Sequence, residues 1–356
     1  MNPSRKIGVL TFHRCINYGS YWQTCCLVAG LRARGHDAVI INHNSGRVNA
    51  AEWKCALQPV LPTPVARRDR LLYGVKLLKF IGAFSALPRS PRLPLEDPDR
   101  MESYDVVIVG SDEVWNLTHP WYGGTALFFG DGVRTRRLVA YAASFGNYDP
   151  STGLEPAWAD RLRGFQGLSV RDENSRTIIR GALGFDPELV LDPCLQFAPR
   201  AEGRRRDAGR RFVAVYGHNF SPWFVREARR WAARCGYPLV SIGYRNDWAD
   251  AQWITAGPRD FPRFIARAEA VVTNFFHGCV FALRQARPFI CETSPYRAIK
   301  VQNLLRTVGG EPHLVSAATP SVAYDTRLEE PPAPAIFQQI EHLRRTSEAY
   351  LDKALA

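Results

Sequence analysis

The chain has 356 residues, of which 46% are hydrophobic, so it is long enough and apolar enough to form two hydrophobic cores of ordinary size. Its formal charge of +12, from 46 lysines and arginines against 34 aspartates and glutamates, favours anionic partners. The basic residues are dispersed and accompany no recognised nucleic-acid-binding module, which argues against a nucleic acid as the partner.

The first elements along the chain form a β-loop-α-β unit. An apolar strand over 7–12, a polar loop over 13–20, a helix over 21–34 and a second strand over 38–41 follow one another. This pattern predicts parallel strands joined by a right-handed crossover. The opening apolar run of about six residues is shorter than a signal-peptide core or a membrane span requires, so a cytoplasmic location is expected.

The next segment, 67–92, is apolar with spaced cations and leaves two interpretations open. One is a helix that packs over the first domain and keeps its lysines in solvent. The other is a helix that lies on a membrane surface, which would be a peripheral contact at the inner face of the membrane.

Two further buried strands are expected over 104–109 and 138–144. Because ligands bind beyond the carboxyl ends of strands in open parallel sheets, the loops over 13–20, 110–116 and 144–149 form the expected functional edge of the first half.

A polar, arginine-rich run over 198–211 separates the two halves. The second half repeats the alternation, with strands over 212–216, 238–243 and 270–273, helices over 223–235 and 260–268, and a last helix over 335–355. The sequence therefore predicts an α/β protein whose two Rossmann-like domains face a cleft, an N-terminal domain over 1–199 and a C-terminal domain over 200–330, followed by a C-terminal helix within 331–356.

Four short sequence blocks, each at or near the end of a predicted strand, follow one another along the chain. They are Asn-Tyr-Gly-Ser at 17–20 with a glutamine at 23, a strand ending in Gly-Ser-Asp-Glu at 105–116, Ser-Val-Arg-Asp-Glu at 169–173, and a strand with Phe-Phe-His-Gly at 271–281. This arrangement resembles the polysaccharide pyruvyl transferase family. The resemblance implies a glycosyltransferase B-like fold and transfer of the pyruvyl group of phosphoenolpyruvate to a sugar or glycan as a ketal, with release of phosphate. It implies a role in exopolysaccharide synthesis with a soluble or lipid-linked acceptor, and the chemistry requires no cofactor beyond the donor and no metal.

Donor binding is expected from basic residues. Arg171 and His277 match the family's arginine and histidine, and the resemblance implies that they bind the donor anion, with Gly278 beside the histidine. His277 also becomes a candidate for proton transfer. Some relatives have an arginine where this chain has Phe275, and Lys300 is a candidate for the missing cation.

Acceptor binding and proton transfer are expected at the other strand ends. Asp112 and Glu113 are candidates for catalysis, and Ser111 and Asp112 for binding acceptor hydroxyls, with capping of the following helix as the structural alternative. A second group, on the first loop and the first turn of the following helix, consists of Asn17, Gly19 and Gln23, and helix capping by Asn17 or Ser20 is the alternative there.

Two other functions remain open. A nucleotide-sugar-dependent glycosyltransferase of similar architecture would normally present acidic residues in the second domain, but 271–291 contains no aspartate or glutamate. A non-catalytic carbohydrate-binding protein is the third possibility, because fold alone does not fix function. If Arg171 and His277 act on the donor, their alanine variants should lose turnover while remaining folded.

Overall fold

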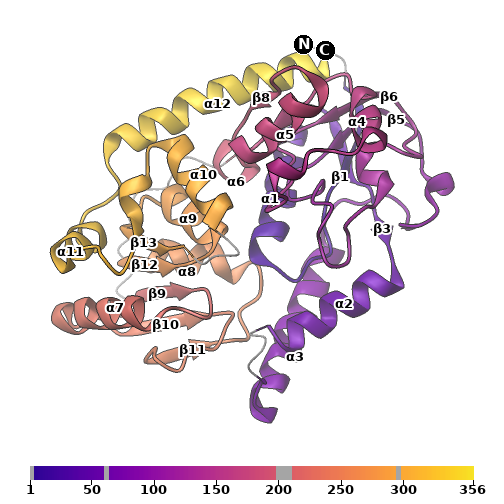
Figure 1. Ribbon diagram of the computed structural model, residues 1–356. Helices are drawn as coiled ribbons and strands as arrows, with labels where there is room; N and C mark the ends of the chain where they lie inside the picture. The colour runs from indigo at the N-terminus through magenta and orange to yellow at the C-terminus, as the bar shows by residue number, and fades with distance from the viewer. Residues whose placement is uncertain (1–3, 60–63, 198–210, 294–297) are drawn as a thin grey trace. The chain divides into compact units, whose positions relative to one another are not determined.

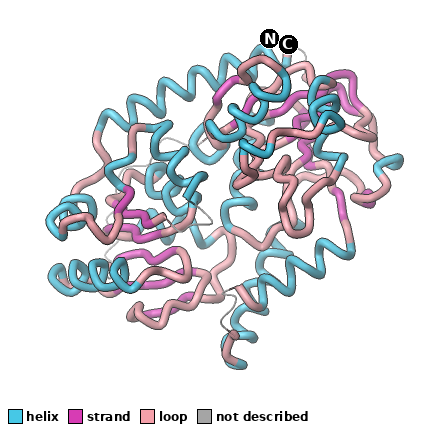
Figure 2. Tube along the Cα trace, in the orientation of Figure 1, coloured by secondary structure: helices cyan, strands magenta, loops and turns pink. Residues whose placement is uncertain are grey.

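Helices and parallel strands alternate along the chain and build two α/β units (Figures 1 and 2). The computed structural model describes residues 4–59, 64–197, 211–293 and 298–356. Unit 1 comprises Met1–Glu52, Ala86–Phe197 and Ile340–Ala356, and unit 2 comprises Trp53–Ser85 and Ala198–Gln339. The predicted fold class, two Rossmann-like α/β domains with a C-terminal helix, is confirmed.

Unit 1 is built on four parallel strands in the order β2-β1-β5-β6. The strands are β1 (Lys6–Leu10), β2 (Asp37–Ile40), β5 (Tyr104–Val109) and β6 (Thr135–Ala140). Their side chains alternate between two cores, as a sheet covered on both faces requires. Ile7 and Val9 pack with helix α1 (Tyr18–Ala33) and the end of the C-terminal helix, whereas Leu10 and Val107 belong to the opposite core.

The remaining elements of unit 1 are short. They are β3 (His43–Asn44), α2 (Gly46–Leu57, which ends in unit 2), β4 (Leu93–Pro94), η1 (Pro98–Arg100), η2 (Ala126–Phe129), η3 (Pro150–Thr152), α4 (Pro156–Arg163), β7 (Ser169–Val170), α5 (Glu173–Leu183), β8 (Glu188–Leu189) and α6 (Pro193–Gln196). Strand β7 continues the sheet beyond β6 through isolated bridges such as Ala143 to Val170.

In the part of unit 2 that the structure describes, six parallel strands lie in the order β11-β10-β9-β12-β13-β14. They are β9 (Val213–Tyr216), β10 (Leu239–Ile242), β11 (Ala251–Trp253), β12 (Ala270–Thr273), β13 (Phe289–Glu292) and β14 (Leu314–Val315). This is the 3-2-1-4-5-6 order of doubly wound nucleotide-binding folds, in which the winding direction reverses between the first and fourth strands. The reversal here lies between β9 and β12.

Helices of unit 2 cover the sheet. Val213, Val215 and Val272 pack against α7 (Pro222–Cys235) and α11 (Ser321–Glu329). On β9 the alternating residue Tyr216 contacts Phe261 of α8 (Asp260–Arg267), and Phe261 in turn contacts α9 (Phe276–Arg284). The unit also contains α10 (Ala298–Val308) and η4 (Glu311–His313).

Helix α3 (Arg67–Ser85) belongs to unit 2, which corrects the expectation that it packs over the first domain. Asp69 pairs with Arg245, and Nζ of Lys76 donates a 2.8 Å hydrogen bond to the carbonyl of Gly243. The expectation that the lysines of this helix lie in solvent is also wrong for Lys76, which is buried. Among the described residues, no helix has the length and apolar character needed to span a bilayer.

The last helix, α12 (Pro334–Leu355), runs along unit 1 from Ile340 onward. Its Leu351 and Leu355 enter the core that contains α1, and the hydroxyl of Tyr350 donates a 2.6 Å hydrogen bond to the carbonyl of Ala140. The predicted C-terminal helix is therefore confirmed, although its last part clusters with unit 1. The expected junction over 198–211 lies almost wholly outside the described residues.

Candidate functional site

The first group of candidate residues lies where unit 1 reverses its winding direction, at the carboxyl ends of β1 and β5. Loops at such a point are the usual ligand-binding position of an open parallel sheet. The hydroxyl of Thr11, just after β1, donates a 2.8 Å hydrogen bond to the carbonyl of Ser111, just after β5. The hydrogen bond from Ser20 to Asp112 brings the sequence blocks at 17–20 and 110–116 together, as expected from the strand pattern.

Arg171 lies between two carboxylates in this part of unit 1. Its Nη1 is 3.0 Å from Oδ2 of Asp192 and its Nη2 is 3.2 Å from Oδ1 of Asp112. Burial would lower the pKa of Arg171, but the carboxylates of Asp112, Asp192 and Asp172 more than offset this, so the pKa is raised. A donor anion would have to compete with both partners, so the geometry favours a positioning role over the expected role in direct anion binding.

Asp112 is held from several sides. Ser20 Oγ donates to its Oδ2 at 2.7 Å, and the backbone N–H of Glu113 donates to its Oδ1 at 3.0 Å. Asp112 is buried and Glu113 is half-buried, with Oε2 accepting a 3.0 Å hydrogen bond from Asn116 Nδ2. Of this carboxylate pair, Glu113 therefore has the greater access to solvent.

The expected acceptor residues on the first loop form internal supports. Asn17 is the N-cap of α1, and its Oδ1 accepts hydrogen bonds from the N–H groups of Gly19 and Ser20 at 2.7 and 3.3 Å. The helix thus begins at Tyr18, earlier than predicted, because this cap satisfies its first N–H groups. The structural alternative, helix capping, accounts for Asn17 and Gly19.

Gln23 and Ser111 are fully buried and hydrogen-bonded to each other through Ser111 Oγ and Gln23 Oε1. Gln23 Nε2 also donates to the hydroxyl of Thr11 at 3.1 Å. Both side chains therefore connect α1 to the loops after β1 and β5. Contact with an acceptor would require these hydrogen bonds to break, so the geometry again favours support of the site over direct binding.

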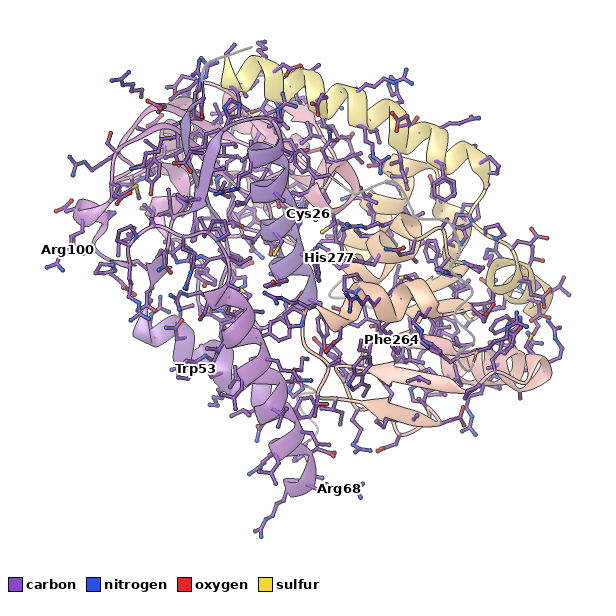
Figure 3. All side chains as sticks on the ribbon, turned by 180° about the vertical axis from the view of Figure 1, so that it is seen from behind. Cys26, Trp53, Arg68, Arg100, Phe264 and His277 are labelled. Carbon is purple, nitrogen blue, oxygen red and sulfur yellow. The ribbon has the colours of Figure 1, made fainter. Side chains whose placement is uncertain are left out.

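The second group of candidates lies at the reversal point of unit 2, beyond β9 and β12. Asn274 Nδ2 donates a 2.8 Å hydrogen bond to the carbonyl of His218, which ties the two loops together. His277, labelled in Figure 3, is the second residue of α9. The residue is 8% exposed. The unsatisfied N–H groups of a helix start favour an anion, and the first turn of α9 contains no acidic residue.

Gly278 is explained by packing. A Cβ at this position would lie 2.0 Å from Thr273 Oγ1, and this hydroxyl donates a 2.6 Å hydrogen bond to the carbonyl of Tyr216. A glycine is needed for α9 to lie close to β12, so approach of a ligand is not required to account for it. Lys300 is half-buried in the first turn of α10, a helix that packs against α9.

Sequence reasoning missed two buried carboxylates at strand ends. Asp192 holds Arg171 and also caps α6 by accepting from the N–H of Cys194. Glu292, at the end of β13, accepts hydrogen bonds from the N–H and hydroxyl of Ser221 just before α7. Burial raises the pKa of Glu292. Both could have been found by the strand-end rule used for Asp112, since each ends an apolar run.

Comparison with known families is decisive at this point. The family model described as polysaccharide pyruvyl transferase matches residues 17–294. The chain belongs to the polysaccharide pyruvyl transferase family. The match spans the reversal points of both units, and membership makes the chain a polysaccharide-modifying transferase. The family suggested by the four sequence blocks is confirmed.

Solved structures similar to this polysaccharide pyruvyl transferase family member include sugar-processing enzymes. The glycosyltransferase SnogD from Streptomyces nogalater is 13% identical with a TM-score of 0.47, and the match covers 99% of this chain and 98% of that one. A UDP-GlcNAc 2-epimerase from Neisseria meningitidis bound to UDP-GlcNAc is 8% identical with a TM-score of 0.48, covering 96% and 93%. Comparison with proteins of curated function gives no match.

Proposed function

We propose that the protein transfers the pyruvyl group of phosphoenolpyruvate to two hydroxyls of a sugar or glycan, forming a cyclic ketal and releasing phosphate. The observation that carries this proposal is the family match over 17–294, which includes every candidate residue named above except Lys300. The reaction as proposed needs no cofactor or metal beyond the donor itself.

The proposed chemistry sets the groups that the protein must provide. A proton adds to the methylene carbon of phosphoenolpyruvate, and the first sugar hydroxyl attacks the neighbouring carbon and loses its proton. The bond from that carbon to the phosphate oxygen then breaks, phosphate leaves, and a second hydroxyl closes the ketal and loses its proton. Of the two protons lost by the sugar hydroxyls, one restores the general acid that protonated the methylene carbon. The other leaves with the phosphate. A general acid, a general base and fixed positive charge are therefore required.

We assign donor binding to unit 2. His277 and the N–H groups at the start of α9 would hold the phosphate or carboxylate, and His277 is the proposed proton donor to the methylene carbon. The absence of acidic side chains over 271–291 suits an anionic donor. Lys300, in the first turn of the neighbouring helix, would supply the second cation.

We assign the acceptor to unit 1. Glu113 is the proposed base for a sugar hydroxyl because it is the more accessible of the two adjacent carboxylates. Asp112 would contact the acceptor only through the part of its carboxylate that Arg171 and Ser20 do not contact. Arg171 acts by fixing Asp112, so it is a positioning residue in this proposal.

The test is acceptor-dependent release of phosphate from phosphoenolpyruvate, with mass spectrometry of a panel of glycans and lipid-linked sugars. Each turnover should add one pyruvate less one water to the acceptor. His277→Gln should abolish both signals, whereas His342→Gln, which changes an exposed histidine on α12, should preserve them. Transfer of a sugar from a nucleotide sugar without use of phosphoenolpyruvate would refute the proposal in favour of a glycosyltransferase.

A further inference from the structure

Helix α3 is apolar on two faces. Its buried face carries Tyr73, Phe80, Ala83 and Phe84, and it also includes the charged residues Asp69 and Lys76. Leu71 is 76% exposed, Val75 43% and Leu78 68%. An ordinary surface helix has apolar residues on the face turned toward the core and polar residues on the opposite face, so the exposed leucines and valine of α3 are a departure from that pattern.

Specific contacts fix this orientation of α3 on unit 2. Asp69 accepts hydrogen bonds of 2.5 and 2.7 Å from the Arg245 guanidinium, and the backbone N–H of Arg245 donates to the hydroxyl of Tyr73 at 3.0 Å. Nζ of Lys76 donates to the carbonyl of Gly243 and lies 4.4 Å from the centre of the Tyr244 ring. Turning the outward face inward would separate Asp69 from Arg245 and break the hydrogen bonds of Tyr73 and Lys76, at a high energetic cost.

These contacts therefore keep the leucines of α3 on the outward face of the helix. Residues 71, 75 and 78 are spaced i, i+4 and i+7, so they form one stripe along the helix. Leu72 and Ile81, 38% and 36% exposed, widen the stripe on either side. A face of this kind, unusual on a soluble protein, marks a site of interaction.

Positive charge borders the stripe. The first turns of α3 present exposed Arg67, Arg68 and Arg70, with Arg68 labelled at this end of the helix in Figure 3, and Lys79 lies further along. The sole acidic residue of α3 is Asp69, which is buried. The residues of α3 on the outward face thus combine apolar side chains with cations and include no carboxylate, although Lys79 lies 3.9 Å from Asp260 of α8.

We propose that the outward face of α3 binds the surface of an anionic phospholipid bilayer. The leucines would enter the boundary between headgroups and acyl chains, and the arginines would contact the headgroup phosphates. Charge complementarity selects this occupant over a second copy of the chain, because a symmetric pairing of two α3 faces would bring like-charged arginines together. The proposal does not depend on which donor the enzyme uses.

The first test is co-sedimentation of the full chain with vesicles of phosphatidylglycerol mixed into phosphatidylcholine, compared with phosphatidylcholine alone. Leu71→Ser with Leu78→Ser should reduce partitioning at least about tenfold, since two exposed side chains lose their apolar insertion. The matched control is Val322→Ser, which changes an isolated valine of α11 that is 75% exposed, and it should bind as the unchanged protein does.

The second test concerns charge. Arg67→Gln with Arg70→Gln should weaken binding about fivefold per arginine, and binding should fall as salt is raised from about 0.1 M to about 1 M. Arg134→Gln with Arg136→Gln removes the same charge from exposed positions of unit 1 and should have little effect. Melting temperatures should be unchanged in all variants, because each altered side chain is exposed.

Three results would overturn the proposal. The first is equal binding to vesicles with and without phosphatidylglycerol. The second is that the protein with both leucine substitutions binds the vesicles as well as the unchanged protein does. The third is a dimer in sedimentation velocity that becomes a monomer when the leucines are replaced. The last result would identify the face as a contact between copies of the chain. None of these outcomes bears on phosphate release, so this proposal and the proposed reaction can fail separately.

Discussion

Arg171 and Asp112 form a buried ion pair, with 3.2 Å between Nη2 and Oδ1, and the side chains are 4% and 9% exposed. Asp192 completes the arrangement on the other side of the guanidinium. Removing the arginine would leave two carboxylates buried without their counter-charge. This geometry therefore predicts that an alanine variant of Arg171 loses stability as well as turnover.

Arg171→Ala should lower the free energy of unfolding by about 3–5 kcal/mol, the usual cost of breaking a buried pair by removing one partner. Urea unfolding followed by circular dichroism measures this change. The control is Arg176→Ala, which removes partly exposed ion pairs with Glu173 and Asp186 and should cost less than about 1 kcal/mol. If Arg171→Ala lost activity with no loss of stability, direct contact with the substrate would replace the positioning role.

Gly278→Ala should destabilise unit 2 by about 1–3 kcal/mol, because the added methyl group overlaps the Thr273 side chain where α9 lies against β12. Gly181→Ala, in helix α5, provides the comparison, since nothing lies within 4 Å of a Cβ there. That substitution should stabilise the protein by up to about 1 kcal/mol. Thermal unfolding of both variants decides the matter: a neutral Gly278→Ala would show that packing does not require this glycine.

Lys76 should make stability depend on pH. Burial lowers the pKa of Lys76 to about 7 from its ordinary 10.5. Between these values the unfolded chain holds a proton that the folded chain does not, so the contribution of Lys76 to stability rises with pH, by about 1.4 kcal/mol per pH unit. Below about pH 7 both states are protonated and this contribution levels off.

The measurement is chemical unfolding from pH 7.5 to 9, values inside the window set by the two pKa values of Lys76. Lys76→Met should remove the upward slope. Lys79→Met, which replaces a more exposed lysine of the same helix, should retain it. An unchanged slope in Lys76→Met would mean that the buried amine stays protonated, stabilised by Gly243 and the Tyr244 ring.

Much of the fold follows from local sequence. The strands at 104–109 and 270–273 were predicted with their observed bounds because each is an apolar, largely β-branched run bounded by polar residues. The rule that ligands bind beyond the carboxyl ends of parallel strands also identified the loops after β1 and β5. The structure joins these two loops by a hydrogen bond within unit 1. The strand predicted over 138–144 begins and ends earlier, at Thr135–Ala140, because its arginines lie at the partly exposed start of the strand.

Tertiary contacts explain what the sequence could not predict. The sequence left Asn17 open between ligand binding and helix capping, and the hydrogen bonds to Gly19 and Ser20 favour capping. For Gln23, the hydrogen bond to Thr11 shows that its side chain connects the helix to the loop. The docking of α3 on unit 2 depends on the pairing of Asp69 with Arg245, which lies 176 residues further along the chain. Hydropathy patterns do not encode such long-range pairing of charges.

The central claim, that phosphoenolpyruvate is the donor, is tested most directly by isothermal titration calorimetry of the purified full chain at low salt, with UDP and nucleotide sugars titrated in parallel. We expect phosphoenolpyruvate to bind, His277→Ala to abolish that binding with the protein still folded, and UDP to give no heat. Binding of UDP or a nucleotide sugar with none of phosphoenolpyruvate would contradict the account and indicate a nucleotide-sugar-dependent glycosyltransferase.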